Sequence, residues 1–255
     1  MKPKLLALLT SLSLFMMVAS CVVSVTTSFG GQSVASGTNS AQSLIVPAGY
    51  AFSIWTPIYL GLLIYAILQL LPRNWHNPRY QKANPWVIVN AWSNALWLPA
   101  ASFGMVWLTV GFIIPMLVSL VFINHHLQIG RVKVPAAEAW LVRLPMSIYF
   151  GWVTLATALN IAAYLVDIGW DGGFLAPEIW TVVIMAVAFG IAMVVYLKVA
   201  NLAYILVVVW AFAAIAVARA NDYPLIYWAA LSGVAIALLA ALAYKRLKPG
   251  FVSFI

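Results

Sequence analysis

Three apolar segments of this chain each carry a stripe of aromatic and amide side chains at helical spacing. The stripes consist of Trp55 with Tyr59, of Asn90, Asn94 and Trp97, and of Trp152, Ala156 and Asn160. Residues three, four, seven or eight positions apart share one face of a helix. If the three helices pack together, they offer a flat aromatic surface with a few hydrogen-bonding groups. That chemistry suits a site for a bulky, planar, mostly apolar ligand.

The same residue types also have purely structural roles in membrane proteins. An asparagine within a span often hydrogen-bonds a neighbouring helix, which is worth roughly 1 kcal/mol or less. Tryptophan and tyrosine near the ends of spans often lie at the membrane surface. Trp55 and Trp152 lie about two turns inside their apolar segments, so surface anchoring explains them less well. Both interpretations stay open at this point.

Composition places the chain in a membrane. Of its 255 residues, 65% are hydrophobic and only 7% are charged, whereas soluble domains carry about 25% charged residues. The net charge of +8 reflects a scarcity of acids, five against thirteen Lys and Arg. We therefore expect an integral membrane protein whose first partner is the lipid bilayer, and no nucleic-acid surface.

Eight segments are long and apolar enough to cross a bilayer, which takes about 20 residues each. They are 5–27, 48–72, 84–101, 104–123, 144–166, 177–197, 200–219 and 223–244. Three of the joints between them are so short that the helices on either side must form antiparallel hairpins. The sequence thus predicts an all-α bundle of about eight transmembrane helices.

Basic residues alternate between the two ends of these segments. Twelve of the thirteen fall on one side, and Arg219 alone falls on the other. Loops rich in Lys and Arg stay in the cytoplasm. The pattern predicts an even number of spans with both termini cytoplasmic, and we expect the inner (plasma) membrane of a bacterium.

The first span has an alternative interpretation. Residues 18–21, Val-Ala-Ser-Cys, resemble a lipoprotein cleavage box, and cleavage would leave a lipid-anchored chain of seven spans that begins at Cys21. The apolar run continues past Cys21, which favours an uncleaved helix. Because Cys21 is the single cysteine, an internal disulfide and a cysteine-built metal site are excluded.

No group of residues forms a catalytic pattern. The acids lie in loops or at the ends of spans, so a carboxylate proton relay is not supported. His125 and His126 are adjacent and point to different faces of a helix. The sequence therefore predicts no catalytic residue, no metal ligand and no required cofactor.

Three stretches, FSIWTPIY (52–59), NALWLP (94–99) and GWVTLATALN (151–160), resemble the translocator protein family, also called tryptophan-rich sensory proteins (TspO/MBR). The family has a W-x-x-x-Y core in its second helix and an Asn with Trp and Pro in its third. Its fifth helix has a Trp eight residues before a Leu-Asn pair. All three motifs occur here in the same order, and the resemblance covers about residues 1–166.

The resemblance implies a five-helix core over 1–166, with a pocket that opens toward the first loop. Residues 167–255 would add three helices to the same membrane domain, as in a longer branch of the family. Family members bind porphyrins, haem-like tetrapyrroles or sterols and often form homodimers. A bound porphyrin or haem-like tetrapyrrole and a homodimer are thus implied for this chain. The family often has a proline before the tyrosine of its fifth helix, whereas Ile148 precedes Tyr149 here, which leaves the exact ligand open.

The leading hypothesis is a membrane-embedded binding protein for a tetrapyrrole or sterol-like ligand that acts as a sensor or regulator. A small-molecule transporter, for example of tetrapyrroles, is one alternative, although transport usually leaves paired repeats or intramembrane charges. A light- or oxidant-dependent enzyme that degrades a bound porphyrin is a second. A purely structural helical bundle is a third.

Overall fold

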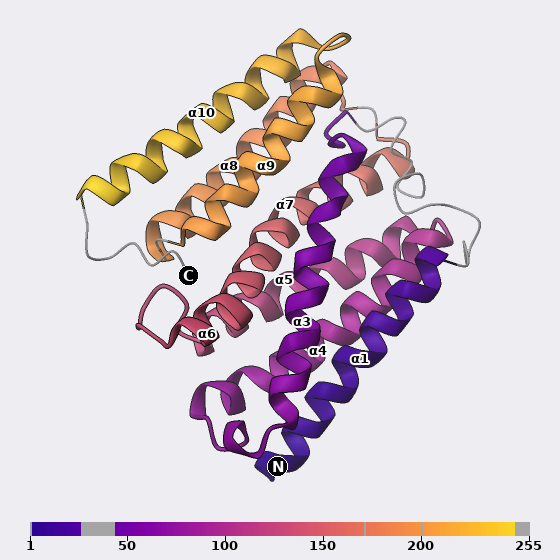
Figure 1. Cartoon of the computed structure of the whole chain (residues 1–255). Helices are drawn as coiled ribbons and strands as arrows, with labels where there is room; N and C mark the ends of the chain where they lie inside the picture. Colours follow the sequence, from indigo (N-terminus) through magenta and orange to yellow (C-terminus); the bar gives the residue numbers. More distant parts are fainter. Residues whose placement is uncertain (1, 27–43, 171, 200, 248–255) are drawn as a thin grey trace.

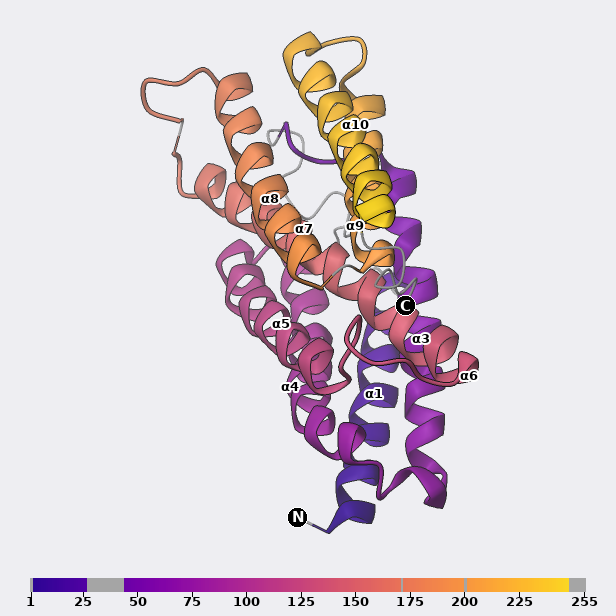
Figure 2. The same cartoon turned by 90° about the vertical axis from the view of Figure 1, so that its left-hand side faces the viewer.

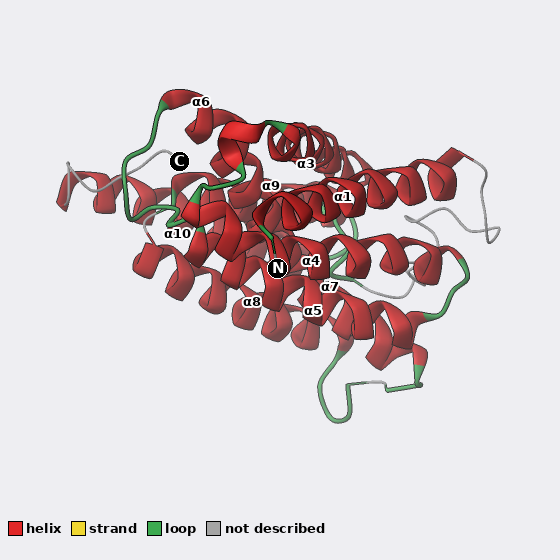
Figure 3. Ribbon diagram, turned by 90° about the horizontal axis from the view of Figure 1, so that it is seen from below, coloured by secondary structure: helices red, strands yellow, loops and turns green. Residues whose placement is uncertain are grey.

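The computed structural model describes residues 2–26, 44–170, 172–199 and 201–247, and these contain helices and no strand (Figures 1 and 3). Eight of the helices are long. They are α1 (Pro3–Thr26), α3 (Trp55–Leu70), α4 (Pro78–Ser102), α5 (Val106–His126), α7 (Leu144–Asp167), α8 (Pro177–Val199), α9 (Leu202–Arg219) and α10 (Pro224–Leu247). The eight predicted spans are confirmed as eight long helices, with ends that differ by a few residues.

Seven spans in the described part of the chain are long and apolar enough to cross a membrane. The long helix outside this set is α4, whose buried residues include Asn84, Asn90 and Asn94. It packs against α1 and α5, so its amides face protein rather than lipid, where an unpaired polar group is costly. The chain is an all-α membrane protein, as the composition predicts.

Successive long helices run in alternating directions, so the bundle has two ends (Figure 1). We call the end where α1, α4, α7 and α9 begin the basic end. The first five long helices lie together, and α8, α9 and α10 form a second group beside them (Figure 2). Helix α7 packs against α3, α5, α8 and α9 and so joins the two groups.

Close helix contacts in this bundle depend on glycine. A Cβ at Gly61 of α3 would collide with the ring of Pro145 in α7. A Cβ at Gly151 of α7 would lie 3.0 Å from the carbonyl oxygen of Tyr204 in α9. Small residues let helices approach in lipid, where packing rather than water exclusion drives association. These glycines therefore let α3 approach α7 at Pro145 and α9 approach it at Gly151.

The segment that leads into α3 differs from the expected continuous span. A 3-10 helix, η1 (Gly49–Ile54), comes first, and the α-helix begins at Trp55. Pro57 then lies in the first turn of α3, where its missing N–H costs little because the first four N–H groups of a helix lack intrahelical partners. Trp55 accordingly marks the start of α3 rather than a position two turns inside it.

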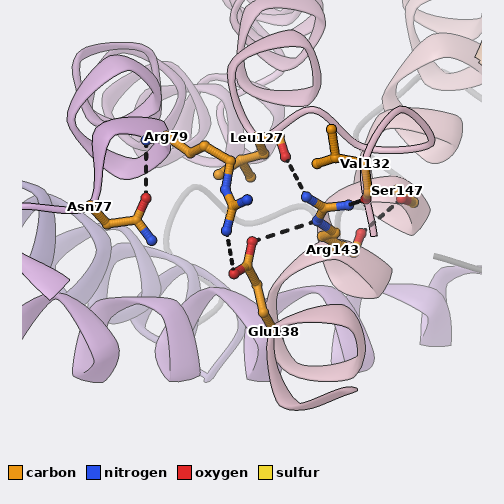
Figure 4. Close-up of polar contacts among 7 residues, drawn as sticks. All are labelled: Asn77, Arg79, Leu127, Val132, Glu138, Arg143 and Ser147. Carbon is orange, nitrogen blue, oxygen red and sulfur yellow. Dashed lines mark hydrogen bonds and ion pairs between the residues drawn. The ribbon is translucent and has the colours of Figure 1, made fainter. Parts of the chain in front are cut away.

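A buried arginine holds the basic end of α7. Between α5 and α7 lie a short helix, α6 (Ala136–Glu138), and a π-helical turn, η3 (Ala139–Arg143). Arg143 has no exposed surface and donates to the carbonyl oxygens of Val132 (2.6 Å) and Leu127 (2.9 Å), as Figure 4 shows. In the sequence, Arg143 was only one of the basic loop residues that indicate how the spans are oriented in the membrane. In the structure, its hydrogen bonds organise this loop.

Glu138 balances that buried charge. Its Oε1 lies 3.6 Å from Nε of Arg143, and its Oε2 accepts a hydrogen bond of 2.7 Å from Arg79 near the start of α4 (Figure 4). One carboxylate thus links the start of α4 to the start of α7. These are two of the helices that carry the aromatic stripes.

We predict that Gly61→Ala destabilises the bundle by about 1–3 kcal/mol, because the added methyl overpacks the contact with Pro145. Chemical unfolding in detergent micelles measures the change. Gly111→Ala in α5 is the matched control, since a Cβ there meets nothing within 4 Å. Equal stability of the two variants would contradict the close contact.

We predict that Glu138→Gln destabilises the protein by about 3 kcal/mol, because it leaves Arg143 buried without a counter-charge. The same unfolding measurement tests it. Asp167→Asn, at an exposed position at the opposite end, should change stability little. If the two variants unfold alike, Glu138 does not hold the loop as described.

Candidate functional site

Trp55 lies at the centre of an aromatic cluster built from three helices. Its ring stacks on Tyr59 of α3 at 5.1 Å between centroids, with 17° between the planes. It meets the edges of Tyr149 (5.8 Å) and Trp152 (6.4 Å) of α7 and lies tilted against Trp97 of α4 (6.1 Å). These separations and orientations are those that aromatic pairs prefer. The three predicted stripes therefore converge.

Asn94 holds the rear of this cluster by hydrogen bonds. It is fully buried, its Nδ2 donates to the Tyr149 hydroxyl (2.6 Å), and its Oδ1 accepts from the Tyr59 hydroxyl (3.3 Å). The buried thiol of Cys21 in α1 lies 3.3 Å from the same Tyr59 hydroxyl. One amide thus joins groups from α3, α4 and α7, with α1 close behind. A satisfied buried network of this kind orients the rings it touches.

A second hydrogen bond orients the tryptophan of α4. Nε1 of Trp97 donates to Oδ1 of Asn160 in α7 (3.1 Å), and Nδ2 of Asn160 donates to the carbonyl oxygen of Ala156 (2.8 Å). Both side chains are buried. The pair holds α4 against α7, about one turn further along α4 than Asn94. It also gives the surrounding apolar surface an amide group.

A cavity adjoins the cluster, and Asn94 is not among the residues that line it. Five of the predicted residues line it: Trp55, Trp97, Trp152, Ala156 and Asn160. The opposite wall comes from α8 and α9, through Met185, Ala188, Ala211, Phe212 and Ile215. The room inside is narrow, ≈ 50 Å³ for the centre of a water-sized sphere. The cavity is an apolar slot between the aromatic cluster and the C-terminal helices.

The other predicted residues lie away from this slot. Tyr59 and Asn94 support Trp55 from behind, as described above. Asn90 faces α5, where its Nδ2 donates to the hydroxyl of Ser119 (3.0 Å) and to the carbonyl oxygen of Met116 (3.2 Å). Asn90 thus links α4 to α5, whereas Asn94, four residues further along α4, links it to α3 and α7.

The wall from α8 and α9 was not predicted from the sequence. Met185 and Phe212 are ordinary apolar residues of ordinary spans, so their types give no signal of a site. Phe52 of η1 also lines the cavity and meets the edge of Trp152 at 5.8 Å. These residues take part only because the helices that carry them pack beside α7.

Helix α9 also holds the segment 44–54, which borders the cavity through Ile45. Nε of Arg219 donates to the carbonyl oxygen of Leu44 (2.9 Å). Nε1 of Trp210 donates to the carbonyl oxygen of Ala51 (3.1 Å). Helices α8 and α9 therefore form one wall of the cavity. Helix α9 also holds the segment 44–54, which borders the cavity at Ile45.

Residues around the cavity offer aromatic surface and one amide, but no cluster of groups for catalysis. Within the described ranges, His, Cys, Asp and Glu nowhere gather in threes that could hold a metal ion. The arrangement of the lining residues suits recognition of an apolar molecule.

Comparisons with known proteins agree with the motifs. Residues 7–243 match a family described as TSPO-like protein. Neither the curated proteins nor the solved structures gave a match. The matched region includes α8, α9 and most of α10 and so extends beyond the first 166 residues that carry the resemblance. The chain belongs to the TSPO-like protein family.

Proposed function

We propose that this protein binds a planar, mostly apolar ligand of the tetrapyrrole or sterol-like class within the membrane and acts as a sensor or regulator. One observation carries the proposal: three tryptophans, Trp55, Trp97 and Trp152, converge on one side of an apolar cavity. Indoles offer large flat surfaces at little conformational cost. Asn160 supplies the amide that would orient a polar edge of the ligand.

A tetrapyrrole is larger than the present slot, so its binding requires the cavity to widen. The movable wall is the one from α8, where Met185 has a flexible side chain. Helix α9 is held to α7 by the hydrogen bond from Nδ2 of Asn201 to the hydroxyl of Ser147 (2.6 Å) and to the segment 44–54 by the bonds described above. The opposite wall is held by the hydrogen bonds of Asn94 and Asn160. Ligand binding would then displace α8 from α7, and such a displacement is what a sensor needs as its signal.

The transporter alternative is less well supported, because the residues that line the cavity are uncharged and membrane transport sites commonly contain ionisable groups or broken helices. We further propose the inner membrane of a bacterium with both termini in the cytoplasm, on the basis of the alternating basic residues. A homodimer is proposed from the family resemblance alone.

We predict that Trp55→Ala and Trp152→Ala each weaken binding of protoporphyrin IX roughly tenfold or more, since each removes ring surface from the cavity wall. Titration in detergent, followed by porphyrin absorbance, measures the dissociation constant. Unfolding curves of the same samples separate lost binding from lost folding.

Trp107→Ala is the matched control, because Trp107 is 62% exposed at the start of α5 and does not line the cavity. It should bind as the unmodified protein does. Unchanged titration curves for both cavity variants would refute the site. If illumination of the porphyrin complex yields a new absorbing product, and Trp152→Ala abolishes that product, the protein is a porphyrin-degrading enzyme rather than a sensor.

A further inference from the structure

We propose that the ligand reaches the aromatic cavity sideways from the bilayer, through a groove between α7 and α8. The groove has a volume of ≈ 290 Å³ for the same water-sized sphere. Thr157, Ala158 and Ile161 line it from α7, and Val187 and Ile191 from α8. The inference rests on the proposed function, since it concerns the ligand of the same cavity.

The groove opens toward lipid. Val187 is 58% exposed and Ile191 52% exposed, and on the other side of the groove Ile161 is 41% exposed. Helix α8 lies on the outside of the bundle against α7 (Figure 2). In a membrane-spanning helix, such exposed aliphatic side chains contact acyl chains. An apolar molecule dissolved in the bilayer therefore meets the groove directly.

The groove and the cavity meet at one small residue. Ala188 of α8 lines both, and it is 4% exposed. On α7, Leu155 and Leu159 face the cavity, whereas Ala158 and Ile161 face the groove. The two spaces thus lie on either side of the seam between the two helices, and Ala188, the residue that they share, has only a methyl group as its side chain.

The hydroxyl groups along the seam present no obstacle to an apolar ligand. The hydroxyl of Thr157 donates to the carbonyl oxygen of Val153 (2.7 Å), and that of Thr154 donates to the carbonyl oxygen of Phe150 (2.8 Å). Both of these bonds stay within α7, and the bond that the Thr154 hydroxyl accepts from Tyr204 (3.2 Å) runs to α9, so opening the seam between α7 and α8 breaks none of them. Passage needs only the displacement of apolar contacts.

A second cavity gives a competing route from the end opposite the basic one. It lies between the end of α7 and the start of α8, is lined by Val166, Trp170 and Thr181, and shares Ile45 with the aromatic cavity. We call it the vestibule. Ile45 belongs to the segment 44–54, which hydrogen bonds hold to α9.

The physical cost of opening favours the groove. Passing Ile45 would disturb hydrogen bonds worth about 0.5–1.5 kcal/mol each. Opening the α7–α8 seam exchanges apolar protein contacts for contacts with lipid chains, which are as apolar as leucine. Helices in a bilayer have little hydrophobic driving force that holds such a seam shut. The structure therefore assigns ligand access to the α7–α8 side.

The test is the rate of protoporphyrin IX binding to the full chain in phosphatidylcholine vesicles, followed by fluorescence quenching after rapid mixing. Ala158→Phe fills the groove without lining the cavity. We expect association and dissociation to slow by the same factor, roughly tenfold, with an unchanged dissociation constant. Val187→Phe narrows the groove from α8 and should act in the same direction, so the test survives if one variant fails to fold.

Two further variants carry the same aromatic side chain elsewhere. Ala186→Phe, on the exposed face of α8 outside the cavity and the groove, should leave both rates unchanged. Val166→Phe fills the vestibule and should also leave them unchanged. Slowing by Val166→Phe with normal rates in Ala158→Phe would overturn the proposal in favour of the vestibule.

Other outcomes are equally decisive. Normal rates in both groove variants would overturn the access route and leave the binding function standing. If the groove variants slow association but leave dissociation unchanged, the substitutions destabilise the bound complex. That result would also overturn the access route. Absence of porphyrin binding by the unmodified protein would instead refute the proposed function.

Discussion

The hydrogen bonds of Asn94 are the interaction on which the aromatic site depends. A bilayer offers no water to satisfy an amide, so α4 must turn its polar face toward other helices. Asn94 meets that requirement with hydroxyl groups from α3 and α7. The same bonds set the rings of Tyr59 and Tyr149, and these two rings pack on Trp55. The satisfaction of one buried amide thus organises the cluster.

Helix α7 carries this order through the molecule. At its basic end, Arg143 and Glu138 connect it to α4 and to the preceding loop. In its middle, Trp152 and Asn160 form part of the cavity wall. At Gly151 it lies close to α9. Because α7 is held on the α4 side by charged and polar groups and on the α8 side by apolar contacts, its two neighbours differ in how easily they can move.

The C-terminal helices have a definite place in this arrangement. Helices α8 and α9 form one wall of the cavity, and α9 secures the segment 44–54 by hydrogen bonds. The family match runs through them, so they belong to the pattern of this chain's relatives. A pocket with a hydrogen-bonded aromatic wall and a wall from α8 that only apolar contacts hold to α7 would couple ligand binding to a change in helix packing. The proposed sensor function and the lateral access route both use that asymmetry.

Sequence alone determined the membrane class, the number of long helices and the aromatic stripes, because composition, segment length and helical periodicity are local properties. It also identified five of the residues that line the cavity. Periodicity shows which side chains share a face of one helix, but it does not show which neighbour that face meets. Only the tertiary structure could decide that Asn94 joins the cluster while Asn90 faces α5.

The same limit applies to Arg143 and to the wall from α8 and α9. The sequence does not show whether a basic residue in a loop is solvated or buried. The burial of Arg143 depends on carbonyl oxygens of a turn that is distant in the sequence. Met185 and Phe212 became part of the site through packing against α7, and apolar side chains carry no sign of such a role. Packing between helices in lipid depends on shape and on a few close contacts, and these exist only in the assembled bundle.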